Sequence, residues 1–217
     1  TNQFPNESYY DNNSSRIIFD WEYWNIAYLG KDNVLMMSTN GGSSFSPLYT
    51  FTDATSKVLW IEQSHANPQV FYVQLLINSI SKLYKSEDGG ITFSEVALPQ
   101  SKWEIYFSLS YTNEQELWLA FTAGTNGNKV YQTINGGSTW TNITTTALNG
   151  LSIKAIAHQV GTNSGVYIAS RRGPVQYRKA EMNDWQTIGT NVPSASYPLR
   201  VMPFYPKNKL RLGMWNI

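Results

Sequence analysis

Three copies of one glycine turn, at nearly equal spacing, constrain the fold of this chain more than any other feature. The copies begin at Ser38, Ser86 and Thr133, so they are 48 and 47 residues apart. A repeat of this length with a single turn signature predicts stacked four-stranded units, as in the blades of a β-propeller. The three turns are Ser38-Thr39-Asn40-Gly41-Gly42-Ser43-Ser44-Phe45, Ser86-Glu87-Asp88-Gly89-Gly90-Ile91-Thr92-Phe93 and Thr133-Ile134-Asn135-Gly136-Gly137-Ser138-Thr139-Trp140.

The same order of short apolar runs recurs around each turn, which predicts an all-β chain of antiparallel four-stranded blades. The repeat arithmetic gives about four and a half blades. Since half a blade cannot close a ring, we expect the chain to be part of a larger propeller; the alternative is a closed five-bladed ring. The predicted parts are a polar segment at 1–15, blades at 16–56, 57–103, 104–150 and 151–197, and a partial blade at 198–217.

Large aromatic residues recur at matching places within the predicted blades. Tyr72, Trp118 and Tyr167 match in the second strand of a blade, and Tyr84, Tyr131 and Tyr177 match in the third. Blades pack face to face and need large side chains at fixed positions, so we expect these residues in the core.

The residue types within each turn serve the turn itself. Paired glycines permit a positive φ, and Asp or Asn side chains accept hydrogen bonds from backbone N–H groups across a turn. A threonine can return a side-chain bond, and the last aromatic residue can anchor the turn between strands. The predicted structural residues are Ser38, Asn40, Gly42, Phe45, Ser86, Asp88, Gly90, Thr92, Phe93, Thr133, Asn135, Gly137, Thr139 and Trp140.

These turns resemble the Asp-box, or BNR repeat, whose family form is Ser-x-Asp-x-Gly-x-Thr-Trp. Two of the three copies carry Asn where the family has Asp, and a fourth copy at Asn183-Asp184-Trp185 keeps only the tryptophan. The resemblance covers roughly residues 30–190 and implies a β-propeller. Families with such boxes include sialidases, xyloglucan-cleaving endoglucanases, sortilin-type receptors and photosystem assembly factors, so the resemblance does not select one function.

We expect a non-catalytic binding or scaffold module that is secreted, periplasmic or on the cell surface. Its ligand would be a glycan or a protein, and the alternative is a fragment of a glycoside hydrolase of the sialidase or xyloglucanase type. A net charge of +1 and 14% charged residues argue against nucleic acid as a partner. The chain has no cysteine and no apolar run long enough to span a membrane. We expect no cofactor and no metal.

Hairpin geometry predicts which loops share one side of the propeller. Within a blade whose strands are A to D, the A–B and C–D turns lie on one side, and the B–C and D–A loops on the other. In enzymes with these boxes, the resemblance implies that the boxes lie away from the substrate. The candidate working loops are then 30–33, 50–56, 76–81, 97–103, 122–128, 141–152, 171–173 and 190–198.

Few charged residues fall in those working loops. Asp32 and Asp53 are weak catalytic candidates, because a glycosidase needs two carboxylates about 5–10 Å apart. Arg171 and Arg172 are candidate ligand-binding residues, since two guanidinium groups in a tight loop could hold a carboxylate or a sulfate. A solvated hairpin tip is the alternative for the arginine pair.

An aromatic and acidic cluster at Phe19-Asp20-Trp21-Glu22-Tyr23-Trp24 is typical of a sugar site. It falls in an A–B connection, on the side of the glycine turns, and its alternation is also typical of a half-buried strand. His65 and His158 lie in or next to A–B connections as well. Neither histidine has two further ligands nearby in the sequence, so a metal site is not predicted.

Overall fold

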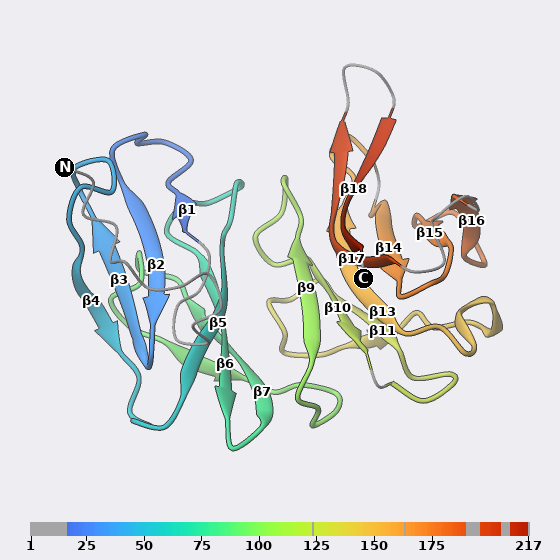
Figure 1. Ribbon diagram of the computed structural model, residues 1–217, viewed down its shortest axis with the longest axis horizontal. Helices are drawn as coiled ribbons and strands as arrows, with labels where there is room; N and C mark the ends of the chain where they lie inside the picture. The colour runs from blue at the N-terminus through green and yellow to red at the C-terminus, as the bar shows by residue number, and fades with distance from the viewer. Residues whose placement is uncertain (1–16, 123, 163, 190–195, 205–208, 217) are drawn as a thin grey trace. The chain divides into compact units, whose positions relative to one another are not determined.

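The chain folds into antiparallel β-sheets, as predicted (Figure 1). A computed structural model describes residues 17–122, 124–162, 164–189, 196–204 and 209–216. Four sheets have four strands each, and a fifth has two. In the described part of the chain, no helix has the length and apolar character needed to cross a bilayer.

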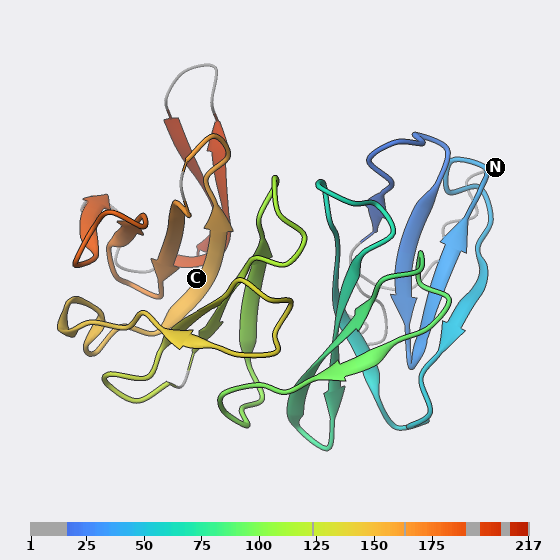
Figure 2. The same ribbon diagram turned by 180° about the vertical axis from the view of Figure 1, so that it is seen from behind.

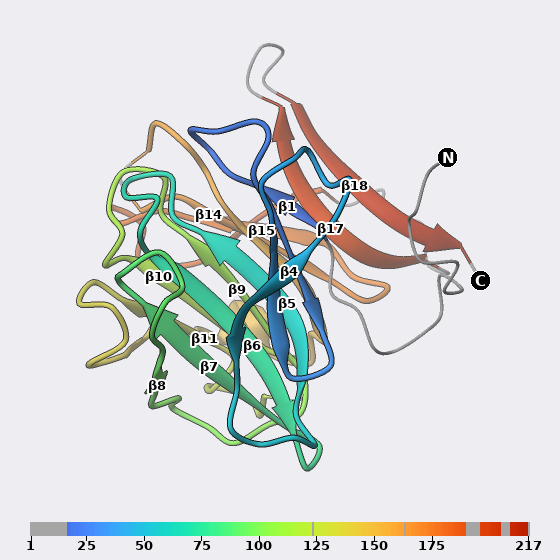
Figure 3. The ribbon, with the colours of Figure 1, turned by 90° about the vertical axis from the view of Figure 1, so that its left-hand side faces the viewer.

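Each four-stranded sheet is a run of consecutive strands, which is the order of a propeller blade. The first sheet contains β1 (Ile18–Phe19), β2 (Ala27–Lys31), β3 (Val34–Ser38) and β4 (Ser46–Thr50). The second contains β5 (Lys57–Gln63), β6 (Phe71–Ile77), β7 (Ile80–Ser86) and β8 (Ser94–Val96), of which β5 to β7 are seen side by side in Figure 3.

The third and fourth sheets repeat this order. The third contains β9 (Ile105–Leu109), β10 (Leu117–Phe121), β11 (Val130–Thr133) and β12 (Thr141–Asn142), and a short 3-10 helix, η1 (Thr146–Leu148), follows it. The fourth contains β13 (Ile153–His158), β14 (Val166–Ser170), β15 (Val175–Arg178) and β16 (Gln186–Gly189). The hairpin of β17 (Ser196–Phe204) and β18 (Lys209–Asn216) forms the fifth sheet, which Figure 2 shows from behind.

The chain divides into two compact units, one ending at Trp103 and the other beginning at Glu104. In the first unit, β2 of the first sheet packs against β5 of the second. Alternate strand residues point into the space between the two sheets, which gives one apolar core. Its buried members are Tyr28, Leu35, Phe51, Val58, Ile61, Phe71, Val73 and Leu75.

In the second unit, β13 packs against β9 of the third sheet and against β17 of the fifth. Trp118 is the largest fully buried side chain of its core. Its indole stacks on the imidazole of His158, with ring centroids 4.9 Å apart and planes at 10°. The other buried members are Ala120, Val130, Ile143, Leu148, Ile153, Ile156, Val166, Ile168 and Trp185.

The aromatic residues expected in the core are buried or partly buried, but one of them is out of register. Tyr72, Trp118 and Tyr167 occupy equivalent places, since each follows the first residue of its strand. Tyr84 and Tyr131 pair with Val73 and Leu119, whereas Tyr177 pairs with Tyr167. The predicted match of Tyr177 to the other two is therefore wrong by one residue, which places it on the opposite face of its sheet.

We predict that His158 makes the stability of the chain depend on pH. Burial lowers the pKa of His158, although the charge of Glu116 partly offsets this. Its Nδ1 accepts a hydrogen bond from the backbone N–H of Tyr111, at 3.3 Å, and protonation would remove that acceptor. The unfolded chain takes up this proton near pH 6.5, so stability should fall as the pH drops below that value, by at most about 1.4 kcal/mol per pH unit.

The matched variant is His158→Gln, because glutamine occupies the equivalent position in the second sheet as Gln63 and can also accept the N–H bond. Urea denaturation at pH 7.5, 6.0 and 5.0 should show a smaller pH dependence for the variant than for the native chain. His65, whose pKa burial lowers to about 4, contributes in the same direction and remains in both proteins. An equal pH dependence in the two proteins would contradict the role of His158.

Candidate functional site

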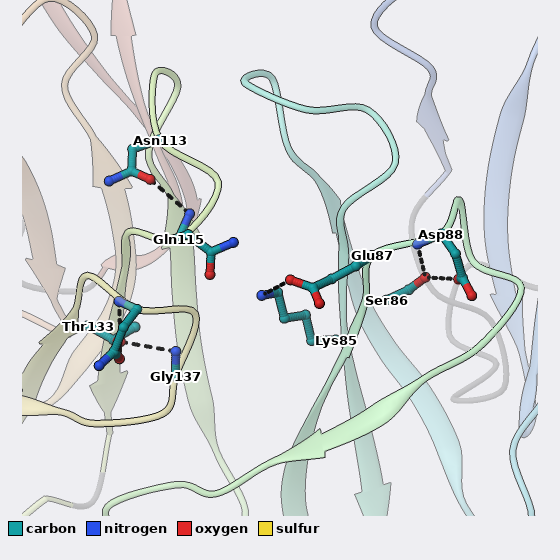
Figure 4. Close-up of polar contacts among 9 residues, drawn as sticks. Lys85, Ser86, Glu87, Asp88, Asn113, Gln115, Thr133 and Gly137 are labelled. Atoms are coloured by element: carbon teal, nitrogen blue, oxygen red, sulfur yellow. Dashed lines mark hydrogen bonds and ion pairs between the residues drawn. The ribbon is translucent and has the colours of Figure 1, made fainter.

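In each glycine turn, the first side chain holds the second glycine in place. The hydroxyl oxygen of Ser38, Ser86 or Thr133 accepts a bond from the N–H of the glycine four residues later, at 2.9, 2.9 and 3.0 Å. The same hydroxyl donates to Oδ1 of the residue two positions later, at 2.9, 2.8 and 2.9 Å. Figure 4 shows the bonds of Ser86 with Asp88 and of Thr133 with Gly137.

Aspartate and asparagine fill the centre of these turns in two complementary ways. The Asp88 carboxylate accepts bonds from the hydroxyl and the N–H of Thr92, at 2.6 and 2.9 Å, and these bonds lower the pKa of Asp88 to about 2. Asn40 and Asn135 keep the acceptor oxygen but donate through Nδ2 to the hydroxyl four residues later, at 2.8 Å. Because a hydroxyl can donate or accept, either residue closes the turn. The side chains of Ser38, Asn40, Ser86, Asp88, Thr133 and Asn135 are thus engaged within the turns themselves.

The glycine turns lie beside the A–B loops, as hairpin geometry predicts. The N–H of the first glycine in each turn donates to a carbonyl of the A–B loop in the same sheet. These bonds join Gly41 to Asn25 at 2.7 Å, Gly89 to Gln69 at 2.9 Å, and Gly136 to Gln115 at 2.8 Å.

The A–B loops are themselves a second repeat, which the sequence analysis did not recognise. Residues 20–26, 64–70, 110–116 and 159–165 connect the first and second strands of the four sheets, and each loop has the same length. In all four, the N–H of the first residue donates to the carbonyl of the last, at 2.7–3.0 Å. Positions in the loops can therefore be compared one by one.

The first A–B loop, residues 20–26, is anchored by the carboxylate of Asp20. Its Oδ1 accepts bonds from the backbone N–H groups of Glu22 and Tyr23, at 2.9 and 3.0 Å. Its Oδ2 accepts bonds from Nε2 of Gln63 at 2.6 Å and from the hydroxyl of Tyr28 at 3.1 Å. The predicted placement of this cluster in an A–B connection is confirmed. Its other interpretation, a half-buried strand over residues 19–24, is wrong, because strand β1 ends at Phe19 and these bonds hold the following residues in a loop.

The electrostatics of this anchor favour a charged, fixed carboxylate. Burial alone would raise the pKa of Asp20, but the bonds from Gln63, from the two backbone N–H groups and from Tyr28 together lower it. Burial and the charge of Asp20 raise the pKa of Tyr28 above its usual range. With both oxygens engaged at neutral pH, Asp20 stabilises the loop and is not suited to transfer a proton.

Trp21 connects the loop to the second sheet. Its Nε1 donates to the carbonyl of Gln63 at 3.1 Å, and its ring lies against the imidazole of His65, with centroids 3.3 Å apart. Its backbone N–H donates to Oε1 of Gln63 at 3.3 Å, and the equivalent N–H of Tyr111 donates to His158. Trp21 therefore has a structural role in packing the first sheet against the second. Its backbone hydrogen bond to the last residue of the neighbouring first strand recurs at Tyr111 in the second unit.

Tyr23 and Trp24 stand at the tip of the loop and are exposed, with 57% and 83% of their surface accessible. The equivalent positions hold Asn67 and Pro68 in the second sheet, and Asn113 and Glu114 in the third. Those are ordinary turn residues, and they close the same turn. In all three loops, the carbonyl of the fourth residue accepts the N–H of the seventh. The fold therefore does not require two aromatic rings at this tip.

A small depression lies beside the first glycine turn, with a volume of about 150 Å³. Two of its lining residues, Thr39 and Ser44, belong to that turn, and Met37, Ser46, Pro47 and Leu48 complete it. Trp24 lies close to the same turn, because a Cβ added to Gly41 would be 3.9 Å from its ring. The Trp24 ring and the depression thus border the same glycine turn.

The two carboxylates predicted as catalytic candidates lie in loops of the first unit. Asp32 is exposed in the β2–β3 turn, with a φ of 49°, and its carbonyl accepts the N–H of Val58 at 2.8 Å. Asp53 lies between β4 and β5, where Oδ1 accepts bonds from the hydroxyl and the N–H of Thr55 at 2.6 and 2.8 Å. These bonds lower the pKa of Asp53. A general acid needs a raised pKa, so Asp53 does not have the environment of a general acid, and its bonds to Thr55 are those of a turn-forming residue.

Arg171 and Arg172 occupy the β14–β15 turn and are both exposed. The N–H of Arg171 donates to the carbonyl of Ser152 at 2.8 Å, and Arg172 has a φ of 52°. Their assignment to an anionic ligand remains a prediction. Among the described residues, no three His, Asp or Glu side chains are grouped as metal ligands would be.

Solved β-propellers share this fold at low sequence identity. A GH74 xyloglucanase from Xanthomonas campestris is 16% identical with a TM-score of 0.60, over 81% of this chain and 30% of that one. YCF48 from Cyanidioschyzon merolae is 16% identical with a TM-score of 0.60, over 88% of this chain and 60% of that one. YCF48 bound to a D1 peptide is 15% identical with a TM-score of 0.60, over 92% of this chain and 59% of that one.

These similarities establish the β-propeller fold and no more. The chain spans between 30% and 60% of the length of these three proteins. No family model matches the chain, and no curated protein does. Because one fold carries enzymes and peptide-binding proteins alike, the function has to be argued from the residues of this chain.

Proposed function

We propose that this chain is a non-catalytic binding module, and that the tip of the first A–B loop, Tyr23 and Trp24, is its ligand-binding surface. One observation carries the proposal: two exposed aromatic rings stand where the equivalent loops need only turn residues. Exposed aromatic residues are enriched among the residues that contribute most binding energy at interfaces. The loop beneath them is fixed by Asp20, so little conformational entropy would be lost on binding.

The glycine turns support a placement among propellers with Asp-box repeats. Their hydroxyl, amide and carboxylate groups form one repeated hydrogen-bond pattern, in which Asn and Asp are interchangeable. Extracytoplasmic location is part of the same proposal, because many members of that class are secreted. Cell fractionation of the source organism, with an antibody to the chain, tests that location.

Glycoside hydrolysis is the second candidate, and the GH74 neighbours are the observation that favours it. It would require a catalytic pair such as Asp32 and Asp53. One carboxylate oxygen of Asp53 accepts two hydrogen bonds from Thr55, and these bonds lower the pKa of Asp53. The lowered pKa argues against Asp53 as the general acid of such a pair, and leaves it only the role of the ionised nucleophile or base.

The test combines binding with product analysis on the whole chain. Glycan arrays and purified peptides serve as probes, and reducing-end release is measured with xyloglucan and sialyllactose. We expect binding that Trp24→Ala weakens and that Asp32→Ala and Asp53→Ala leave unchanged, with no product released. Release of product that Asp53→Ala abolishes would establish an enzyme instead and refute the proposal.

A further inference from the structure

We propose that the ligand of this surface is a neutral oligosaccharide, stacked on the rings of Trp24 and Tyr23 and held by hydroxyl groups of the first glycine turn. The inference rests on the proposed function, since it names the ligand class of the same surface. It is carried by three observations: the accessibility of the rings, the polar groups that adjoin them, and the charges of the two loops.

More than half of the surface of both aromatic residues is accessible. Trp24 is 83% exposed, and the turn under it contains glycine at positions 41 and 42, so no side chain of those residues covers the ring. An aromatic face carries partial negative charge, which attracts the slightly positive C–H groups on the apolar side of a pyranose ring. A flat, rigid side chain also loses little entropy on binding.

The depression beside the first glycine turn combines hydroxyl groups with apolar side chains, since Met37, Pro47 and Leu48 line it together with three hydroxyl residues. Thr39 and Ser44 line the depression beside the turn, and Ser43 is exposed between the glycines and Ser44. A sugar presents hydroxyl groups around an apolar face, so it matches a ring flanked by small polar side chains. An apolar peptide would bind more favourably in a continuous apolar groove.

The charge of the A–B loop favours a neutral ligand over an anionic one. Residues 20–26 and 39–45 contain no Lys or Arg, and they carry the carboxylates of Asp20 and Glu22. A sialylated glycan, a phosphate group or an anionic membrane surface would meet like charge here. A neutral sugar meets no such repulsion.

The experiment measures binding of four oligosaccharides to the whole chain by calorimetry. The neutral probes are cellohexaose, maltohexaose and a xyloglucan heptasaccharide, and sialyllactose is the charged comparison. We expect saturable binding of at least one neutral probe, with no binding of sialyllactose. Trp24→Ala should weaken that binding about tenfold or more, and Tyr23→Ala should weaken it less.

Trp103→Ala is the matched control, because Trp103 is another exposed tryptophan of the same unit, in the connection between β8 and β9. We expect its affinity to stay within about twofold of the native chain. Circular dichroism spectra should be native-like for all variants, since every replaced ring is exposed.

Failure of this inference can be told apart from failure of the proposed function. Absence of saturable binding to all neutral probes, or equal affinity in the Trp24→Ala variant, would overturn the sugar assignment. So would preference for sialyllactose, or binding of a peptide probe alone that Trp24→Ala abolishes. In that last case the assignment of Tyr23 and Trp24 as the binding surface would still hold. The proposal that the chain is non-catalytic is tested separately, by the release of product.

Discussion

The Gly90→Ala variant should lose about 2–4 kcal/mol of unfolding free energy, from two effects that add. Gly90 has a φ of +87°, a conformation that a residue with a Cβ adopts only under strain. An added Cβ would also lie 2.9 Å from Cδ2 of Leu48 and 3.5 Å from Cδ2 of Leu35, both in the first sheet. The turn of the second sheet is thus packed against the first sheet, and an added methyl group would displace the end of the Leu48 side chain.

Gly42→Ala is the matched control for the backbone effect alone. Gly42 occupies the same position in the first turn with a φ of +85°, but its added Cβ would meet only Phe45, at 4.0 Å. Its expected loss is about 1–2 kcal/mol. Urea denaturation of the two variants separates strain from packing, and a Gly90→Ala loss no larger than that of Gly42→Ala would contradict the close contact between the sheets.

The Trp118→Ala variant should lose about 3–5 kcal/mol, because it empties the largest fully buried position of the second unit. The loss has two parts: the transfer of the indole to water, and the cavity that the surrounding sheets cannot close. The stacking of the indole on His158 adds to the first part. Guanidinium denaturation, monitored by circular dichroism, measures the change.

Trp118→Phe keeps an aromatic ring in the core and should lose less than half as much. Trp140→Ala is a second comparison, because Trp140 is a partly buried tryptophan that directly precedes β12, in the same sheet as Trp118. If Trp118→Ala were to cost less than about 1.5 kcal/mol, the packing described for the second unit would be wrong.

The sequence predicted those parts of the fold that depend on local chemistry. Gly-Gly pairs have few uses other than a positive φ, and Gly89 and Gly90, with φ values of 76° and 87°, have it. The Ser, Thr, Asn and Asp side chains at fixed places in each turn bond to one another, so the spacing of the turns indicates four-stranded blades. Strand register is less local, which is why Tyr177 was placed one residue away from its true position.

The candidate site was harder to predict, because it lies in the repeated A–B loops. These loops have the same length but different residues, so their sequences do not look alike. The A–B loops share their length and their closing bonds, but their first residues are Asp20, Ser64, Ser110 and Gln159. The alternation of apolar and acidic residues at 19–24 is that of a strand, whereas in the structure the side chain of Asp20 accepts bonds from two backbone N–H groups of the loop. Aligning the loops by length would have shown that Trp24 has no counterpart in the other sheets.

The location of the ligand tests the account most directly, and hydrogen–deuterium exchange of the whole chain can measure it. With a saturating concentration of the neutral oligosaccharide that binds best, the account predicts slower exchange in peptides that cover residues 20–26 and 39–45, and unchanged exchange in residues 30–33 and 50–56. Protection confined to 30–33 and 50–56, where Asp32 and Asp53 lie, would contradict it and place the ligand on the opposite loops.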